Sequence, residues 1–119
     1  MDGKGIEMDL SQVRKVGDAV VIAFPESRAE EPRRVFHDML KALAENKEYE
    51  RIVVDLSKVS WFSSLDIGGL VFAFREAHAR DGSFVVAGAG SRIAGIFEAT
   101  RMDTVFPMYP TVEEALAAE

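Results

Sequence analysis

Two adjacent serines, Ser63 and Ser64, are the residues of this chain whose position best suits chemistry. They stand just before an apolar pattern with helical spacing, so they are candidate N-caps of a helix. The first N–H groups of a helix lack intrahelical partners, and the helix dipole adds partial positive charge. A phosphate on either hydroxyl would be stabilised there. Serine is also a common cap, so a purely structural role explains the pair as well.

Gly68 and Gly69 interrupt the first turns of the same predicted helix. Each glycine costs a helix up to ~1 kcal/mol relative to alanine, so a close approach is expected to offset that cost. Tight packing of the helix on a sheet would supply it, and so would a docking surface for a partner. Both explanations stay open at this point.

A hydrolytic triad is not predicted. Ser64 can be combined with Asp66 and His78, but no G-x-S-x-G turn surrounds the serine. His78 would lie about 20 Å along the same helix, far outside hydrogen-bond reach. We therefore expect no enzymatic activity.

Metal and cofactor sites are not predicted either. His37 and His78 lack further ligands at zinc spacing and are expected to be surface or boundary histidines. The stretch 88–91, Gly-Ala-Gly-Ser, resembles half of a dinucleotide-binding loop. Its third glycine, Gly95, falls beyond the expected spacing from Gly90, so a tight turn explains the stretch better.

The composition is that of one globular domain. The 119 residues are 48% hydrophobic and 29% charged, include no cysteine, and carry a net charge of −6. This charge argues against nucleic acid as a partner, and it permits a protein with a basic patch. No run approaches the ~18 apolar residues of a membrane span, so no membrane insertion and a cytoplasmic location are expected. Residues 1–11 are predicted to be a flexible or loosely attached N-terminus.

Periodicity predicts alternating strands and helices. Gly17-Asp18 between two apolar runs indicates a hairpin, and the β-branched run 52–56 is the expected centre of the sheet. The expected elements are strands over 12–16, 19–24, 52–56, 83–87 and 105–106, and helices opening at Pro32, at the serine pair, at Ser91 and at Thr111. This order predicts a single α/β domain over 1–119, with a mixed four- to five-stranded sheet and about four helices. Trp61 is expected to be mostly buried.

The chain resembles the STAS superfamily, the fold of anti-sigma factor antagonists. The resemblance spans Val13 to the C-terminus, and order and spacing make it specific. It rests on 52–57 (Ile-Val-Val-Asp-Leu-Ser), on the turn 59–64 with Gly68, on 81–86, and on 97–110 followed by 112–116.

The resemblance implies a protein partner. Members typically bind an ATP-binding serine kinase that doubles as an anti-sigma factor, phosphorylation of a serine breaks that complex, and a phosphatase restores it. Ser64 falls on the phosphoacceptor position. The implied partner-binding residues are Ser63, Ser64, Leu65, Asp66, Gly68, Pro25, Glu26 and Ser27.

Three departures from the family pattern stand out. Ser63 replaces a usual aspartate, Asp66 replaces a usual glycine, and the loop 25–28 (Pro-Glu-Ser-Arg) lacks the family's Gly-x-Leu-Asp-like signature. A Ser63-x-x-Asp66 capping box would let Asp66 supply the missing carboxylate. Alternatively, Asp66 would repel a phosphate on Ser64 or mimic a phosphorylated state.

Two functions follow from these residues. The first is a partner-switching, anti-sigma factor antagonist-like module with Ser64 as the switch. The alternative is a constitutive, non-phosphorylated STAS subunit, or a ligand-sensing domain, in a larger assembly such as a transporter-associated one.

Overall fold

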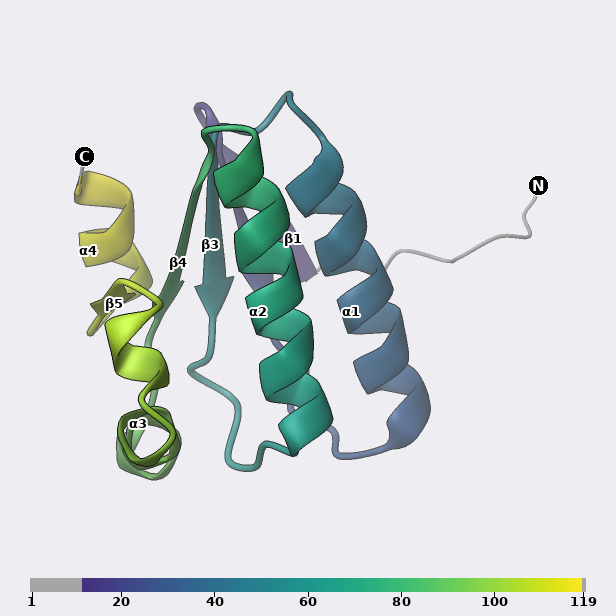
Figure 1. Ribbon diagram of the computed structural model, residues 1–119, viewed down its shortest axis with the longest axis vertical. Helices are drawn as coiled ribbons and strands as arrows, with labels where there is room; N and C mark the ends of the chain where they lie inside the picture. The colour runs from purple at the N-terminus through teal and green to yellow at the C-terminus, as the bar shows by residue number, and fades with distance from the viewer. Residues whose placement is uncertain (1–11, 119) are drawn as a thin grey trace.

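Within residues 12–118, a five-stranded mixed sheet and four α-helices form the fold, as the sequence predicted (Figure 1). This computed structural model describes residues 12–118, and the prediction for residues 1–11 lies outside them. In chain order the elements are β1 (Val13–Val16), β2 (Ala19–Ala23), α1 (Glu30–Glu45), β3 (Arg51–Asp55), α2 (Ser64–Ala79), β4 (Ser83–Ala87), α3 (Ser91–Ala99), β5 (Met108–Tyr109) and α4 (Val112–Ala117).

The sheet order is β1-β2-β3-β4-β5, with β1 antiparallel to β2 and all other neighbours parallel. The β1–β2 hairpin turns at Gly17, whose φ of +62° favours glycine. β3 lies at the centre, as predicted from its β-branched run. Ile52 and Val54 face the main core, whereas Val53 faces the opposite side of the sheet.

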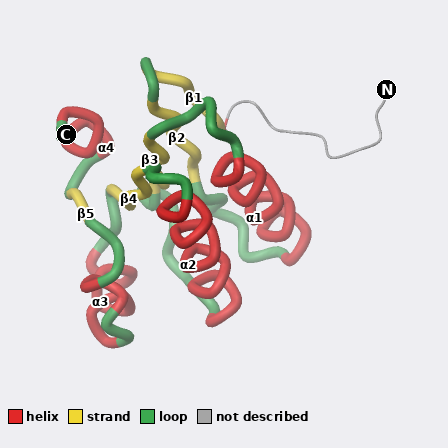
Figure 2. The backbone as a smooth tube through the Cα atoms, turned by 45° about the horizontal axis from the view of Figure 1, so that its top comes forward, coloured by secondary structure: helices red, strands yellow, loops and turns green. Residues whose placement is uncertain are grey.

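The two faces of the sheet are covered unequally. The helices α1 and α2 lie side by side on one face and, with α3, enclose the main core (Figure 1). The short helix α4 lies on the other face (Figure 2). There Val112 and Ala115 pack with Val21, Val53 and Val85. None of the helices within residues 12–118 is long and apolar enough to cross a bilayer.

Two predicted helix starts were wrong. Pro32 is the third residue of α1 rather than the first, and Ala29 is the N-cap. The first turn of a helix tolerates proline because its N–H groups have no intrahelical acceptor. Ser91 is the first residue of α3 and not its cap. Gly90 takes the N-cap position with an extended backbone.

The predicted strand at Val105–Phe106 was also wrong. Phe106 turns into the core, where its ring centroid lies 5.5 Å from that of Phe74 and 5.8 Å from that of Phe97. Pairing with β4 begins one residue later, where the Val86 amide donates to the Pro107 carbonyl over 3.1 Å. Proline cannot donate to the ladder, but its carbonyl still accepts, so β5 follows it.

Arg51 on β3 fastens α4 to the sheet. Its Nη2 atom donates to the carbonyls of Ala115, Leu116 and Ala118 over 2.8, 3.1 and 2.9 Å. The last carbonyls of a helix lack intrahelical donors, and a guanidinium supplies donors together with a charge that suits this end of the dipole.

We expect the Arg51→Met substitution to lower the free energy of unfolding by about 1–3 kcal/mol, because three carbonyls lose a charged donor. Amide hydrogen exchange should accelerate in α4 before it does in α2. Arg14→Met on the edge strand β1 is the matched control, because Arg14 is exposed, and its effect should stay within about 0.5 kcal/mol. Equal losses in the two variants would contradict this role for Arg51.

Candidate functional site

The first turn of α2 is held by the capping box that the sequence predicted. Ser63 is the N-cap, and its Oγ accepts a hydrogen bond from the Asp66 amide over 3.2 Å. In return, Asp66 Oδ2 accepts from the Ser63 amide over 2.9 Å and from the Ser63 hydroxyl over 3.1 Å. This reciprocal pairing satisfies donors that the helix itself leaves open.

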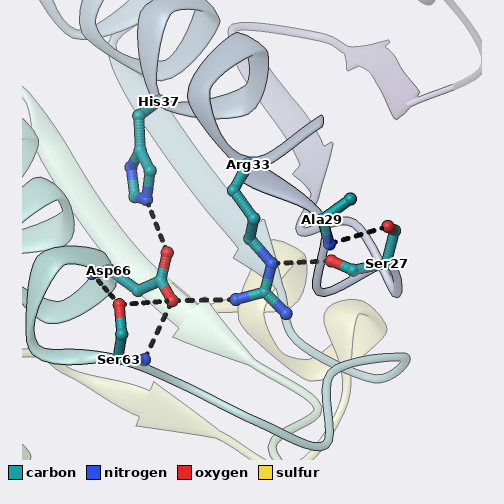
Figure 3. A network of polar contacts seen from close by, with 6 residues as sticks. All are labelled: Ser27, Ala29, Arg33, His37, Ser63 and Asp66. Atoms are coloured by element: carbon teal, nitrogen blue, oxygen red, sulfur yellow. Dashed lines mark hydrogen bonds and ion pairs between the residues drawn. The ribbon is translucent and has the colours of Figure 1, made fainter. Parts of the chain in front are cut away.

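The Asp66 carboxylate also joins α2 to α1 (Figure 3). Arg33 Nη1 donates to Asp66 Oδ2 over 2.9 Å, and His37 Nε2 lies 3.1 Å from Asp66 Oδ1. Asp66 is 4% exposed and Arg33 is 6% exposed. The pair is therefore a buried salt bridge, in which each charge depends on the other.

Asp66 is ionised in this setting. Burial favours the neutral acid, but the amide of Ser63, His37, the Arg33 charge and the Ser63 hydroxyl outweigh it. Together they hold the pKa of Asp66 below its usual value. The carboxylate is thus charged at neutral pH, and its charge is compensated within the protein.

Arg33 further connects this cluster to the loop between β2 and α1. Its Nε donates to the Ser27 carbonyl over 2.8 Å (Figure 3). Its guanidinium carbon lies 4.6 Å from the ring centroid of Phe24. Arg33 therefore forms hydrogen bonds with both segments that the family resemblance assigned to partner binding, 25–27 and 63–68.

Sequence reasoning missed Arg33 and His37 as parts of this cluster. A signal was present, since Arg33 stands three residues before Phe36 and so shares the buried face of α1. His37 was expected to be an ordinary boundary histidine, and its side chain is 22% exposed. The His37 side chain lies at the boundary of the core and makes a polar contact with Asp66.

The predicted partner-binding residues divide into surface and interior groups. Ser64 is the exposed first residue of α2, Leu65 is 84% exposed, and Gly68 is exposed. Asp66 is buried and Ser63 is partly buried. In the β2–α1 loop, Pro25 is partly buried, whereas Glu26 and Ser27 are exposed.

The neighbouring glycines have different surroundings. A Cβ at Gly69 would lie 2.6 Å from Cε1 of His37, so this glycine lets α1 and α2 approach. The packing partner is α1, not the sheet that the sequence suggested. A Cβ at Gly68 would meet nothing within 4 Å. Close packing within the chain therefore explains Gly69 alone.

Trp61 is more exposed than predicted. Its side chain, in the loop before α2, is 38% exposed instead of mostly buried. The guanidinium groups of Arg28 and Arg33 lie 5.6 and 5.5 Å from its ring centroid. The ring thus forms part of the surface beside the serine turn, in contact with two cations.

Within residues 12–118, the candidate side chains for a hydrolytic triad or a metal site do not come together. Ser64 and His78 lie near opposite ends of the 16-residue helix α2, and His37 is engaged with Asp66. The described residues contain no cluster of three or more His, Asp or Glu side chains that could hold a metal ion.

Comparison with known proteins identifies the family of this chain. The family model described as the STAS domain matches residues 12–115. The chain belongs to the STAS domain family. This match covers the whole sheet and reaches into α4, so the capping box and the Arg33–Asp66 pair lie inside the STAS fold.

Relatives of this STAS domain include named anti-sigma factor antagonists. A Thermotoga neapolitana protein whose name assigns it to that class is 26% identical over 103 residues, covering 86% of this chain and 91% of its own. A STAS domain protein of Planctomyces limnophilus superposes with a TM-score of 0.78 at 24% identity, covering 87% and 92% of the two chains. The phosphorylated form of SpoIIAA, a Bacillus cell fate determinant, superposes with a TM-score of 0.69 at 18% identity, covering 88% of this chain and 95% of its own.

Alanine at the two glycines should change stability in opposite directions. Gly68→Ala should raise the free energy of unfolding by about 0.5–1 kcal/mol, through helix propensity alone. Gly69→Ala should lower it by about 1 kcal/mol or more, because the new methyl displaces His37. Urea unfolding would measure the free energy of unfolding of both variants, provided that its dependence on urea concentration is unchanged. Changes of the same sign in the two variants would contradict the packing described here.

Asp66→Asn should cost about 3–5 kcal/mol at pH 7, because it leaves Arg33 buried without its counter-charge. Because the pKa of Asp66 is lower in the folded protein, its carboxylate stabilises the fold at pH values above the pKa of the unfolded chain, about 4. This stabilisation is lost as the pH falls through the pKa of the folded protein. The stability difference between wild type and variant should therefore shrink below about pH 4.

Asp38→Asn is the matched control for this measurement. Asp38 lies on α1, is 47% exposed, and is 3.9 Å from Arg34, so its removal should change stability by less than about 1 kcal/mol. A difference between wild type and Asp66→Asn that stays constant from neutral to acidic pH would show that the charge of Asp66 is not what stabilises the turn.

Proposed function

We propose that this STAS domain is a non-enzymatic partner-switching module of the anti-sigma factor antagonist type. Its partner would be an ATP-binding anti-sigma factor that also phosphorylates Ser64, and a phosphatase would reverse the modification. The observation that carries the proposal is the exposed Ser64 at the first position of α2, on a turn locked by the buried Asp66.

The outer face of α2 offers a docking surface around this serine. Leu65, Gly68 and Phe72 follow one another at spacings of three and four residues, so they share one side of the helix. Leu65 is 84% exposed, Phe72 is 44% exposed, and the space above Gly68 is open. A partner helix or strand can approach the α2 backbone closely at Gly68 and bury both apolar side chains.

Phosphorylation would act by local electrostatics. A phosphate on Ser64 adds close to two negative charges at pH 7 next to the apolar side chain of Leu65. Within a packed interface this charge would be desolvated and would repel any acidic group of the partner. Release of the partner therefore needs no change in the fold of the domain.

Asp66 has an internal role in this proposal. Its buried carboxylate orders the turn that presents Ser64 and does not itself reach the partner. Because Arg33 compensates its charge, the repulsion between Asp66 and a phosphate on Ser64 is reduced. The chain thus keeps a working phosphoacceptor turn although Asp66 stands where the family usually has glycine.

The names of the relatives support the class of function. The Thermotoga protein is named as an anti-sigma factor antagonist, and SpoIIAA has been solved in a phosphorylated form. The net charge of −6 suits a protein partner with a basic patch better than nucleic acid. The proposed site of action is the cytoplasm, where ATP-dependent kinases operate.

A second candidate is a constitutive or ligand-sensing STAS subunit of a larger assembly. A surface hollow of about 410 Å³ beside the serine turn favours it. The same candidate is consistent with the departures at Ser63, Asp66 and the 25–28 loop, which alter the family's usual docking residues.

The direct test is a pull-down from the native lysate with intact-mass analysis of the endogenous protein. We expect an added mass of about 80 Da on Ser64, and a kinase-like ATP-binding partner that is retained only by the unmodified form. Ser64→Asp should weaken binding of that recovered partner at least about tenfold, because it places a charge in the interface.

Ser91→Asp is the matched control, because Ser91 is the exposed first residue of α3 as Ser64 is of α2. It should leave binding unchanged. A single unmodified species in a stable complex that Ser64→Asp does not disturb would contradict the switch and favour the constitutive subunit.

A further inference from the structure

A hollow of about 410 Å³ lies where the β2–α1 loop, the start of α1 and the start of α2 meet. Its volume falls in the range of small-molecule sites, about 300–1,000 Å³. Trp61 and Leu65 supply apolar surface, and Arg28 and Arg33 supply guanidinium groups. The hollow adjoins the Ser64 turn, but Ser64 itself does not line it.

The charge of this hollow is opposite to that of the protein. Three arginines (Arg28, Arg33 and Arg34) and two acids (Glu30 and Asp66) line it, which leaves a net charge of +1 in a chain of −6. Among residues 12–118, Arg28 has no ion-pair partner, and its contact is with the ring of Trp61. Arg28 is therefore a cation available to an incoming anion.

Arg33 provides a second donor. Its Nε and Nη1 are used by Ser27 and Asp66, but its buried Nη2 has no hydrogen-bond partner in the described part of the chain. Buried donors are seldom left unpaired, and an unmade hydrogen bond to a charged group is costly. The ring centroid of the partly exposed Trp61 lies 5.5 Å from this guanidinium, and both side chains line the hollow.

We propose that the hollow is a binding site for a small aromatic carboxylate. The carboxylate would be held between Arg28 and Nη2 of Arg33, since guanidinium groups match carboxylates with paired, charge-assisted hydrogen bonds. The aromatic ring of the ligand would pack against Trp61 and the side chain of Leu65. Arg28 belongs to the 25–28 loop, in which the sequence suggests a departure from the family signature.

The test uses the unmodified full chain with phenylacetate, phenylacetamide and inorganic phosphate as probes. Trp61 is the single tryptophan of the chain, so its fluorescence and its indole N–H signal in NMR spectra report on the hollow directly. We expect saturable changes with phenylacetate, and affinities at least about tenfold weaker for the neutral amide and for phosphate.

Arg28→Gln should weaken phenylacetate binding at least about tenfold. Its NMR spectrum should otherwise remain that of the folded protein. Arg92→Gln, an exposed arginine of α3 outside the hollow, should bind as wild type does. The proposal is overturned if the amide or phosphate binds as tightly as phenylacetate, if Arg28→Gln retains affinity, or if no saturable change is seen at Trp61. No partner or kinase is present, so this outcome is independent of the Ser64 switch.

Discussion

The buried salt bridge between Arg33 and Asp66 is the interaction on which the site depends. Taking two charges out of water is costly, and good geometry with further hydrogen bonds must compensate. Asp66 meets this requirement through Ser63, Arg33 and His37, and Arg33 does so in part through the Ser27 carbonyl. One ion pair thereby fixes the start of α2, the face of α1 and the loop after β2.

The apolar core and this polar cluster have separate tasks. Burial of the main core against the sheet sets the positions of α1, α2 and α3, and α4 closes the opposite face. Hydrophobic burial is non-directional, so it does not by itself fix how a helix begins. The directional hydrogen bonds of Asp66 do that, and they leave Ser64 and Leu65 on the surface of an ordered turn.

Three residues at which the sequence suggests a departure from the family pattern, Ser63, Asp66 and Arg28, line the same hollow. Ser63 and Asp66 form the capping box, and the Asp66 carboxylate lies on the buried side of the turn. There it needs a buried cation, which Arg33 provides. Arg28 then brings positive charge to the adjoining loop. The surface beside the first turn of α2 therefore carries the positive charge of Arg28 close to the exposed side chain of Leu65.

The sequence by itself determined the alternation of strands and helices, the central β3 and the Ser63–Asp66 box, because apolar periodicity and i,i+3 capping are local properties. Only the tertiary structure decided that Arg33 reaches Asp66 across 33 residues of sequence, that Trp61 stays partly exposed, and that pairing with β4 begins after Phe106. These outcomes depend on which segments meet in space, and a charged residue on a predicted helix does not reveal its distant partner.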